Sequence, residues 1–102
     1  MKEIVTSPMA PEPIGNSSQG VVSSGLAFLS GLVGRKQYAT ELENGVAAQT
    51  RQAILNMKAV LAEKNLNLDN VVKTTVFLAD MNDFAEMNGV YAEFLDENTA
   101  PA

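Results

Sequence analysis

The sequence predicts a two-layer α+β domain in which two helices cover one face of a β-sheet. Two apolar runs within residues 20–31 indicate a β-hairpin, and residues 2–6 alternate weakly like a short strand. Helical periodicity runs over residues 46–64 and returns over residues 83–95. Between these helices, residues 71–78 are rich in β-branched side chains, which favours a strand. The order β-β-β-α-β-α is typical of helices packed on a single sheet face.

The first third of the chain is predicted to contain strands and ordered loops. Residues 7–19 include three prolines, and proline cannot donate a ladder hydrogen bond, so this stretch is expected to be a loop. Ser24 and Gly25 separate the two apolar runs of the hairpin, which indicates a tight turn. A second loop is expected at residues 32–45.

The first helix is expected to bury one stripe of side chains at spacings of three and four residues. That stripe consists of Val46, Thr50, Ala53, Ile54, Met57, Val60 and Leu61. The polar side chains expected to face water are Gln49, Gln52, Asn56 and Glu63. Asn65 is predicted to follow the helix in the left-handed conformation.

Both faces of the strand predicted at residues 71–78 carry apolar groups. The side chains expected to be buried beneath the helices are Val72, Val76 and Leu78. The opposite face includes Val71 and Phe77 and needs a second cover. In a chain this short, that cover is expected to be another subunit.

The second helix, at residues 83–95, follows a candidate N-cap at Asp80 or Asn82. The stripe that it is expected to bury consists of Phe84, Met87, Tyr91, Phe94 and Leu95.

The composition excludes several kinds of chemistry. The 102 residues, enough for one domain, include no cysteine and no histidine, which removes disulfides, thiol nucleophiles, histidine bases and the commonest zinc ligands. No spaced cluster of carboxylates indicates a metal site, and no cofactor is predicted. Twelve acidic and seven basic residues give a net charge of −5, which argues against nucleic-acid binding. Without a long apolar run or a signal peptide, the expected location is cytoplasmic.

Several segments resemble one known family. Residues 49–52 and 56–61 are similar to the first helix of the reactive-intermediate deaminases (Rid, or YjgF-like proteins), and residues 71–78 with 80–84 to their central strand and turn. The remaining matching residues are Ala10-Pro11, Ile14-Gly15, Ser18-Gln19-Gly20, Ser30-Gly31, Asn88, Val90-Tyr91 and Phe94. The chain is therefore identified as a single Rid-family domain spanning residues 1–102.

The resemblance implies a fold, an assembly and an activity. The fold is a two-layer sandwich of the chorismate-mutase-like type, a mixed β-sheet with two helices on one face. The assembly is a homotrimer with ligand pockets in the clefts between subunits. The activity is the hydrolysis of reactive 2-imino acids, such as 2-iminobutanoate, to 2-keto acids and ammonia without a cofactor.

The resemblance also implies four substrate-binding residues. Ser30 and Gly31 match pocket positions after the third strand, and Asn88 matches a pocket position of the second helix. Ser17 occupies the position where the family usually has a tyrosine that packs over the substrate. The alternatives are a polar strand end with a turn glycine, a solvated helical asparagine and a polar loop. Arg35 could contact a carboxylate, but a solvated loop charge is the preferred interpretation.

The sequence ends at Pro101-Ala102, and in the family an arginine that binds the substrate carboxylate follows directly. Two more strands and a glutamate of the pocket come after it. Relative to the family the domain is therefore expected to be truncated at its C-terminus and to lack the last strands. No catalytic residue is assigned, and little or no imine deaminase activity is expected from this chain alone.

Three functions remain open. The first is an imine or enamine deaminase. The second is a non-catalytic, trimeric family member that binds small carboxylates or has a regulatory role. The third is the translation-inhibitor or endoribonuclease role of some relatives, which the acidic charge and the lack of histidine disfavour. The departures from the family pattern at Asn16, Ser17 and Leu32 favour the second function over the first.

Overall fold

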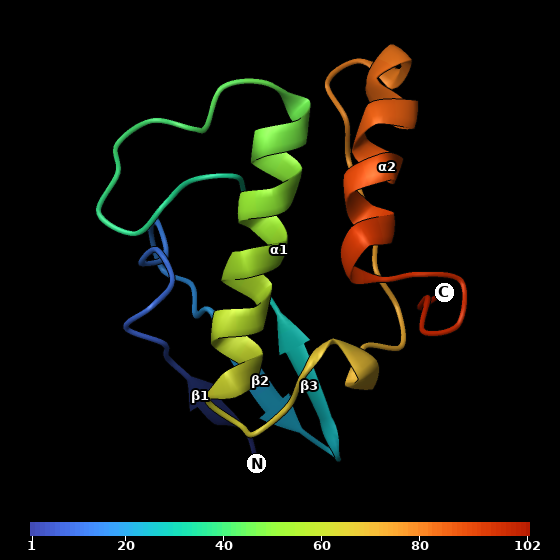
Figure 1. Cartoon of the computed structure of the whole chain (residues 1–102). Coiled ribbons are helices and arrows are strands. Elements are labelled where there is room, and N and C mark those ends of the chain that lie inside the picture. The colour runs from blue at the N-terminus through green and yellow to red at the C-terminus, as the bar shows by residue number, and fades with distance from the viewer.

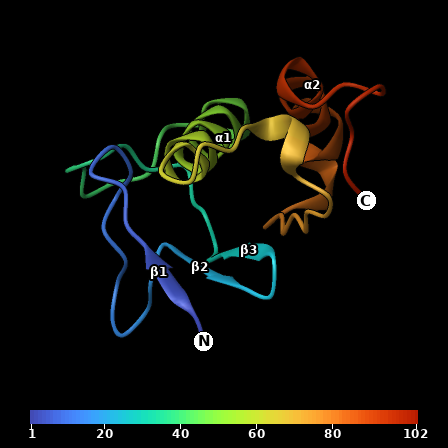
Figure 2. The same cartoon turned by 90° about the horizontal axis from the view of Figure 1, so that it is seen from below.

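The computed structural model describes residues 1–102 and has two layers (Figures 1 and 2). One layer is an antiparallel sheet in the order β1 (Glu3–Val5), β2 (Gly20–Ser23) and β3 (Leu26–Leu29). The other contains α1 (Val46–Ala62) and α2 (Phe84–Phe94), which lie side by side and run in the same direction. Both helices lie on one side of the sheet, as the sequence predicted.

The hairpin forms as predicted. β2 and β3 pair in register from Gly20 opposite Leu29 to Ser23 opposite Leu26. Ser24 and Gly25 have φ angles of 55° and 79°, so both central residues of the turn are left-handed. Turns of this kind match the right-handed twist of the two strands, which is why a tight hairpin forms at this point.

The core lies between α1 and the sheet. Val5 of β1, Ala10 and Val60 of α1 form a buried cluster, and Val22 and Leu29 pack against it. The Ile4–Val21–Phe28 row across the three strands follows from the register and lies on the opposite face of the sheet. On that face Ile4 and Phe28 are 60% and 57% exposed.

The first helix agrees closely with its prediction. It ends at Ala62, two residues before the predicted end, and Asn65 has the expected left-handed φ of 58°. From the predicted stripe Ile54, Val60 and Leu61 are buried, and the other members are half-buried.

Residues 71–78 form no strand, contrary to the prediction. A strand exists only where its backbone groups pair with a neighbour, and β3 does not pair with this segment. Its ladder-like hydrogen bonds are made with Ala102, whose N–H donates to Val72 and whose carbonyl accepts from Thr74, at 3.0 and 2.8 Å. This is the pattern of a parallel pair. The three-stranded sheet itself is antiparallel throughout, so it is not the mixed sheet that was expected.

The predicted burial of residues 71–78 is also wrong in part. Val72 and Val76 are 70% and 47% exposed, and Leu78 is half-buried. Thr74, on the same face, lies against α2, where its hydroxyl and the Tyr91 hydroxyl are 2.7 Å apart. The direction of this face was therefore correct, but one helix beside it does not exclude water from all of its side chains.

Two short 3₁₀ helices, η1 (Leu68–Asn70) and η2 (Met81–Asp83), precede α2. Asp80 caps η2, because its carboxylate accepts a hydrogen bond from the Asn82 N–H at 2.9 Å. The second helix thus starts after the predicted cap, but through a turn of 3₁₀ helix.

α2 buries a stripe that differs slightly from the prediction. Met87 and Leu95 are buried as expected, and Tyr91 and Phe94 are half-buried. Phe84 is 51% exposed, contrary to the prediction, because it is the first residue of the helix and lies at its edge. Val90 is buried instead. Neither helix of the chain has the length and apolar character that crossing a bilayer requires.

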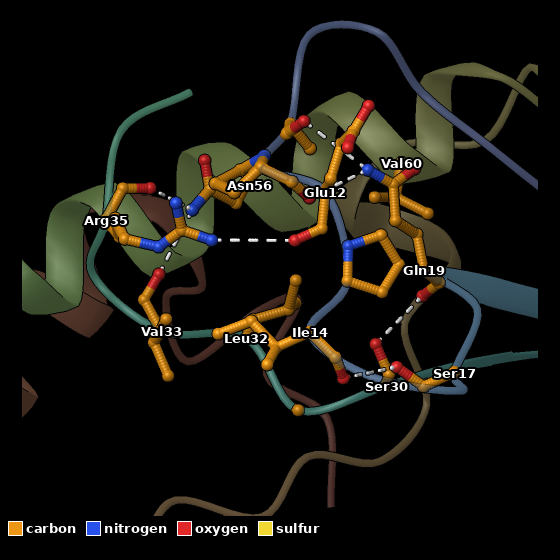
Figure 3. A pocket seen from close by; sticks show the side chains of 14 residues that line it. Glu12, Ile14, Ser17, Gln19, Ser30, Leu32, Val33, Arg35, Asn56 and Val60 are labelled. Carbon is orange, nitrogen blue, oxygen red and sulfur yellow. Dashed lines mark hydrogen bonds between the residues drawn. The ribbon is translucent and has the colours of Figure 1, made fainter. Parts of the chain in front are cut away.

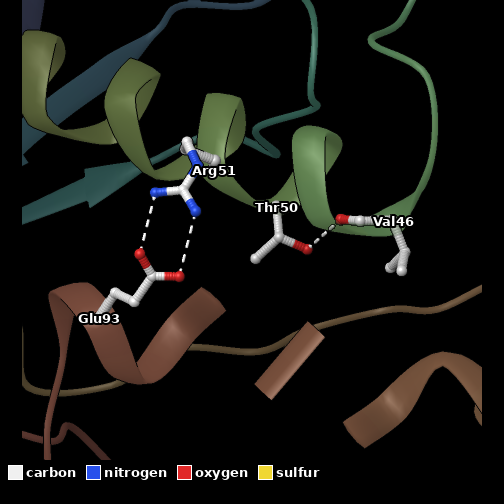
Figure 4. A network of polar contacts seen from close by, with 4 residues as sticks. All are labelled: Val46, Thr50, Arg51 and Glu93. Carbon is white, nitrogen blue, oxygen red and sulfur yellow. Dashed lines mark hydrogen bonds and ion pairs between the residues drawn. The ribbon is translucent and has the colours of Figure 1, made fainter. Parts of the chain in front are cut away.

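A polar contact joins the two helices (Figure 4). The Arg51 guanidinium of α1 forms a two-pronged ion pair with the Glu93 carboxylate of α2, at 3.2 and 3.1 Å. Arg51 and Lys58 also lie over the Phe94 ring, with their charged groups 5.8 and 5.9 Å from its centroid. The Arg51–Glu93 ion pair is exposed, so it contributes about 1 kcal/mol or less to stability.

Candidate functional site

A pocket of about 270 Å³ lies at the end of β3 (Figure 3). The proline-rich loop, residues 30–35 and the middle of α1 form its walls. Ser17, Ser30 and Gly31 all line it, so the structure brings together three of the four substrate-binding residues expected from the sequence. A larger cavity of about 680 Å³ adjoins it, and Arg35 and Glu12 are among the residues that line both spaces.

Ser30 and Gly31 present polar groups to the pocket. The Ser30 N–H and hydroxyl both point to the Gln19 carbonyl, at 3.1 and 3.4 Å, which holds the end of β3 in place. The Gly31 N–H has no hydrogen-bond acceptor within the chain, and no atom lies within 4 Å of where its Cβ would be. A ligand can therefore approach the backbone at Gly31 and accept its hydrogen bond.

Ser17 lies in the exposed part of the pocket wall. Its hydroxyl donates to the Ile14 carbonyl at 3.4 Å, which closes a turn in the loop. Its short side chain leaves open the space that a ring at this position would fill.

Asn88 lies elsewhere. It is exposed on α2 and lines neither of the two cavities described above. Within one chain, the structure therefore does not bring it together with the other three residues.

Gln19 is a buried residue of the pocket that sequence reasoning did not single out. It is 5% exposed, and its side-chain amide donates to the Pro11 and Ser7 carbonyls at 2.9 and 3.2 Å. Its side-chain oxygen accepts from the Ser7 N–H. One signal in the sequence could have identified it. Prolines supply no N–H, so the loop before Gln19 has more carbonyl acceptors than donors, and a glutamine amide can donate to them. Through these bonds Gln19 holds the loop that carries Ser17.

Asn56 is buried, so the prediction that it faces water was wrong. It is 3% exposed, and its side-chain N–H₂ donates to the carbonyls of Val33 and Arg35, at 3.0 and 2.9 Å. The Gln52 amide donates to its oxygen at 2.9 Å. The periodicity of the helix was correct, but the loop at residues 32–45 folds over this side of α1 and brings carbonyl groups that need donors.

Gly34 allows that loop to approach α1 closely. A Cβ at this position would lie 2.3 Å from Cα of Gln49, so only glycine fits without displacing backbone. The Glu43 N–H donates to the Gly34 carbonyl at 2.8 Å, and the Gln49 amide donates to the Glu43 carbonyl at 2.9 Å. Both ends of the loop are therefore attached to the start of the helix.

Arg35 is not the solvated loop charge that the sequence favoured. It is half-buried, and its guanidinium donates to the Ala39 carbonyl at 2.6 Å and to the Glu12 carbonyl at 3.5 Å (Figure 3). It is the only lysine or arginine among the residues that line the pocket. The tight loop around Gly34 turns this side chain inward, which charge and position in the sequence could not indicate.

Comparisons with known proteins agree with one another. The family model described as "Endoribonuclease L-PSP" matches residues 7–102. A RutC family protein of Synechocystis is 40% identical over 102 residues, which are 98% of this chain and 78% of that protein. The "Putative reactive intermediate deaminase TdcF" of Escherichia coli is 37% identical over 100 residues, with the same coverage of both chains.

Solved structures give the same result for the fold. A "putative endoribonuclease L-PSP" from Entamoeba histolytica is 38% identical, with a TM-score of 0.92 over 100% of this chain and 82% of that one. Escherichia coli TdcF with bound serine is 35% identical, with a TM-score of 0.88 over 98% and 79%. The fold fits the chorismate-mutase-like α+β class. The chain therefore belongs to the Rid family, the family of YjgF-like and endoribonuclease L-PSP proteins.

Proposed function

We propose that this protein is an imine deaminase that hydrolyses small 2-imino acids to 2-keto acids and ammonia. The observation that carries the proposal is the pocket in which Ser17, Ser30 and Gly31 lie together. The similarity to a relative called a reactive intermediate deaminase supports the same reaction. Single-domain architecture, with residues 1–102 as one Rid domain, is part of the proposal.

The pocket offers groups that suit an imine. Hydrolysis adds water to the C=N carbon and then expels ammonia from the tetrahedral intermediate, so the protein must hold the substrate and the water in place. The free Gly31 N–H can donate to the substrate, and the Ser30 hydroxyl can orient the nitrogen or the water. Glu12 is the only carboxylate residue that lines the pocket, and no acid is assigned to the activation of the water.

The assembly that we propose is a homotrimer, which would supply what one chain lacks. The exposed Ile4–Val21–Phe28 row offers an apolar sheet face for a neighbouring subunit. In a trimer the Asn88 side chain of one subunit can complete the pocket of the next, because it is exposed on α2. The ligand pockets would then lie in the clefts between subunits.

The test is the release of keto acid from freshly generated 2-iminobutanoate. We expect the purified protein to accelerate 2-ketobutanoate formation weakly over buffer, because Ser17 provides no ring to cover the substrate. Ser30→Ala should lower the acceleration. Ser23→Ala, at the far end of the hairpin, should leave it unchanged. A folded protein that gave the rate of buffer alone would contradict the proposal.

The second candidate is a family member that binds small carboxylates without turnover. Ser17 at the position of the usual tyrosine favours it. The two functions separate in one experiment, because this candidate requires binding of 2-ketobutanoate together with an unaccelerated reaction. The names of some relatives also mention endoribonuclease and translation initiation inhibitor. The excess of twelve acidic over seven basic residues weighs against phosphate-backbone binding by this chain.

A further inference from the structure

The Arg35 guanidinium is half-buried and has no carboxylate partner. The ion pairs of the chain join Lys36 to Glu43, Arg51 to Glu93 and Lys64 to Glu3. The only carboxylate residue that lines the pocket is Glu12, and it reaches Arg35 through its backbone carbonyl alone. No carboxylate of the chain neutralises the charge of Arg35, which leaves the guanidinium available to an anionic ligand.

The hydrogen bonds of Arg35 leave donors free for a ligand. A guanidinium has five N–H groups, and the carbonyls of Ala39 and Glu12 accept one each. Arg35 Nε makes no hydrogen bond within the chain, and no buried polar side-chain atom lacks a partner, so solvent reaches Nε. The Arg35 side chain lines both cavities. A carboxylate can accept two parallel hydrogen bonds from such a group.

The position of Arg35 is fixed before any ligand arrives. Its own carbonyl accepts from Asn56, and the adjacent Gly34 lies directly against the backbone of α1. The Ala39 carbonyl then holds the guanidinium at 2.6 Å. A side chain held in this way loses little conformational freedom on binding, which is the condition for strong charge-assisted recognition.

We propose that Arg35 binds the carboxylate of a small ligand in the pocket next to Ser30 and Gly31. The cavity of about 270 Å³ suits a molecule of a few heavy atoms. With the carboxylate on Arg35, the other end of the ligand would face Gly31, since both residues line this cavity. This inference rests on the proposed function only for the choice of a 2-keto acid as the probe.

The first experiment compares three probes on the unaltered protein. Isothermal titration calorimetry would measure the dissociation constants of 2-ketobutanoate, its neutral methyl ester and inorganic phosphate. We expect 2-ketobutanoate to bind roughly tenfold or more tightly than the ester, because the ester lacks the charged acceptor. Equal affinity for the ester, or tighter binding of phosphate, would overturn the assignment of a carboxylate site.

The second experiment removes the charge at two neighbouring positions. Arg35→Gln should weaken 2-ketobutanoate binding by roughly ten- to a hundredfold. Lys36→Gln makes the same change of charge one residue later, on a side chain that pairs with Glu43 outside the pocket, and should change affinity less than about twofold. An Arg35→Gln protein that kept the original affinity would refute the proposal.

Arg35→Lys keeps the experiment decisive if Arg35→Gln does not fold. A lysine keeps the charge but loses the planar fork, so we expect an intermediate loss of affinity. In the amide NMR spectrum of the unaltered protein, 2-ketobutanoate should shift Gly31 and the Arg35 side-chain N–H, whereas shifts confined to α2 would contradict the site. Binding that depends on Arg35 without imine hydrolysis would reject only the proposed function. Hydrolysis that does not depend on Arg35 would reject only this inference.

Discussion

The side-chain amide of Asn56 donates a hydrogen bond of 2.9 Å to the carbonyl of Arg35 and so ties the middle of α1 to the pocket loop. The second hydrogen of the same amide bonds to Val33 at 3.0 Å. One buried side chain therefore satisfies two carbonyls that the loop brings against the helix. The fold of the helix and the geometry of the pocket depend on each other at this residue.

Replacement of Asn56 by leucine should destabilise the protein by about 1–3 kcal/mol, since it leaves the part-buried carbonyls of Val33 and Arg35 without their donor. Urea unfolding followed by circular dichroism would measure the change in the free energy of unfolding. Asn98→Ala is the matched control. Because Asn98 is exposed on the turn after α2, the removal of its side chain should change that free energy by less than about 0.5 kcal/mol. Equal effects of the two variants would show that the Asn56 contacts are not stabilising.

Gly34→Ala and Gly89→Ala should change stability in opposite directions. A Cβ at Gly34 would lie 2.3 Å from Cα of Gln49, so the loop must move and the expected loss is roughly 1–3 kcal/mol or more. A Cβ at Gly89 meets nothing within 4 Å, and alanine there favours the helix by about 0.5–1 kcal/mol. Thermal unfolding of both variants checks the prediction, which fails if Gly34→Ala melts at or above the original temperature.

Ser17→Tyr should tighten the binding of 2-ketobutanoate. The hydroxymethyl group of Ser17 covers little of the pocket, whereas a tyrosine ring can pack over a small ligand, and such contacts correspond to roughly three- to tenfold in affinity. Calorimetric titration would measure the change, with Asn98→Tyr on the exposed turn after α2 as control. No gain at Ser17 would mean that this residue does not face the bound ligand.

The protein should form a trimer at micromolar concentration, and Phe28→Ser should weaken it. Phe28 is 57% exposed in the Ile4–Val21–Phe28 row, and its burial between subunits would contribute about 1–2 kcal/mol per chain. Multi-angle light scattering would measure the mass across a dilution series. The control is Lys2→Ser, which changes an exposed polar residue just before β1. A monomer at all concentrations would reject the assembly.

Local patterns in the sequence were enough to predict the two α-helices and the hairpin. The period of residues 46–64 gave α1 within two residues, and Ser24-Gly25 gave the turn of the hairpin. Asn65 was correctly expected to follow α1 in the left-handed conformation, and of the two candidate caps before the second helix Asp80 caps the 3₁₀ helix η2 that leads into α2. These features depend on residues close together in the chain, whose conformational preferences are visible without knowledge of the fold.

The three-dimensional arrangement decided the rest, because burial and pairing depend on residues distant in sequence. Residues 71–78 have the composition of a strand, yet they form none because no neighbouring strand pairs with them. The helical pattern around Asn56 is compatible with an exposed or a buried side chain. Asn56 is buried because the loop at residues 32–45 folds over it and supplies carbonyls that its amide binds. The sequence favoured a surface position for Arg35. In the structure the close approach of Gly34 to α1 directs the Arg35 side chain to the pocket, which it lines. By itself the sequence determined the helices, the hairpin and the family resemblance, while long-range contacts alone determined which polar groups lie inside and what they face.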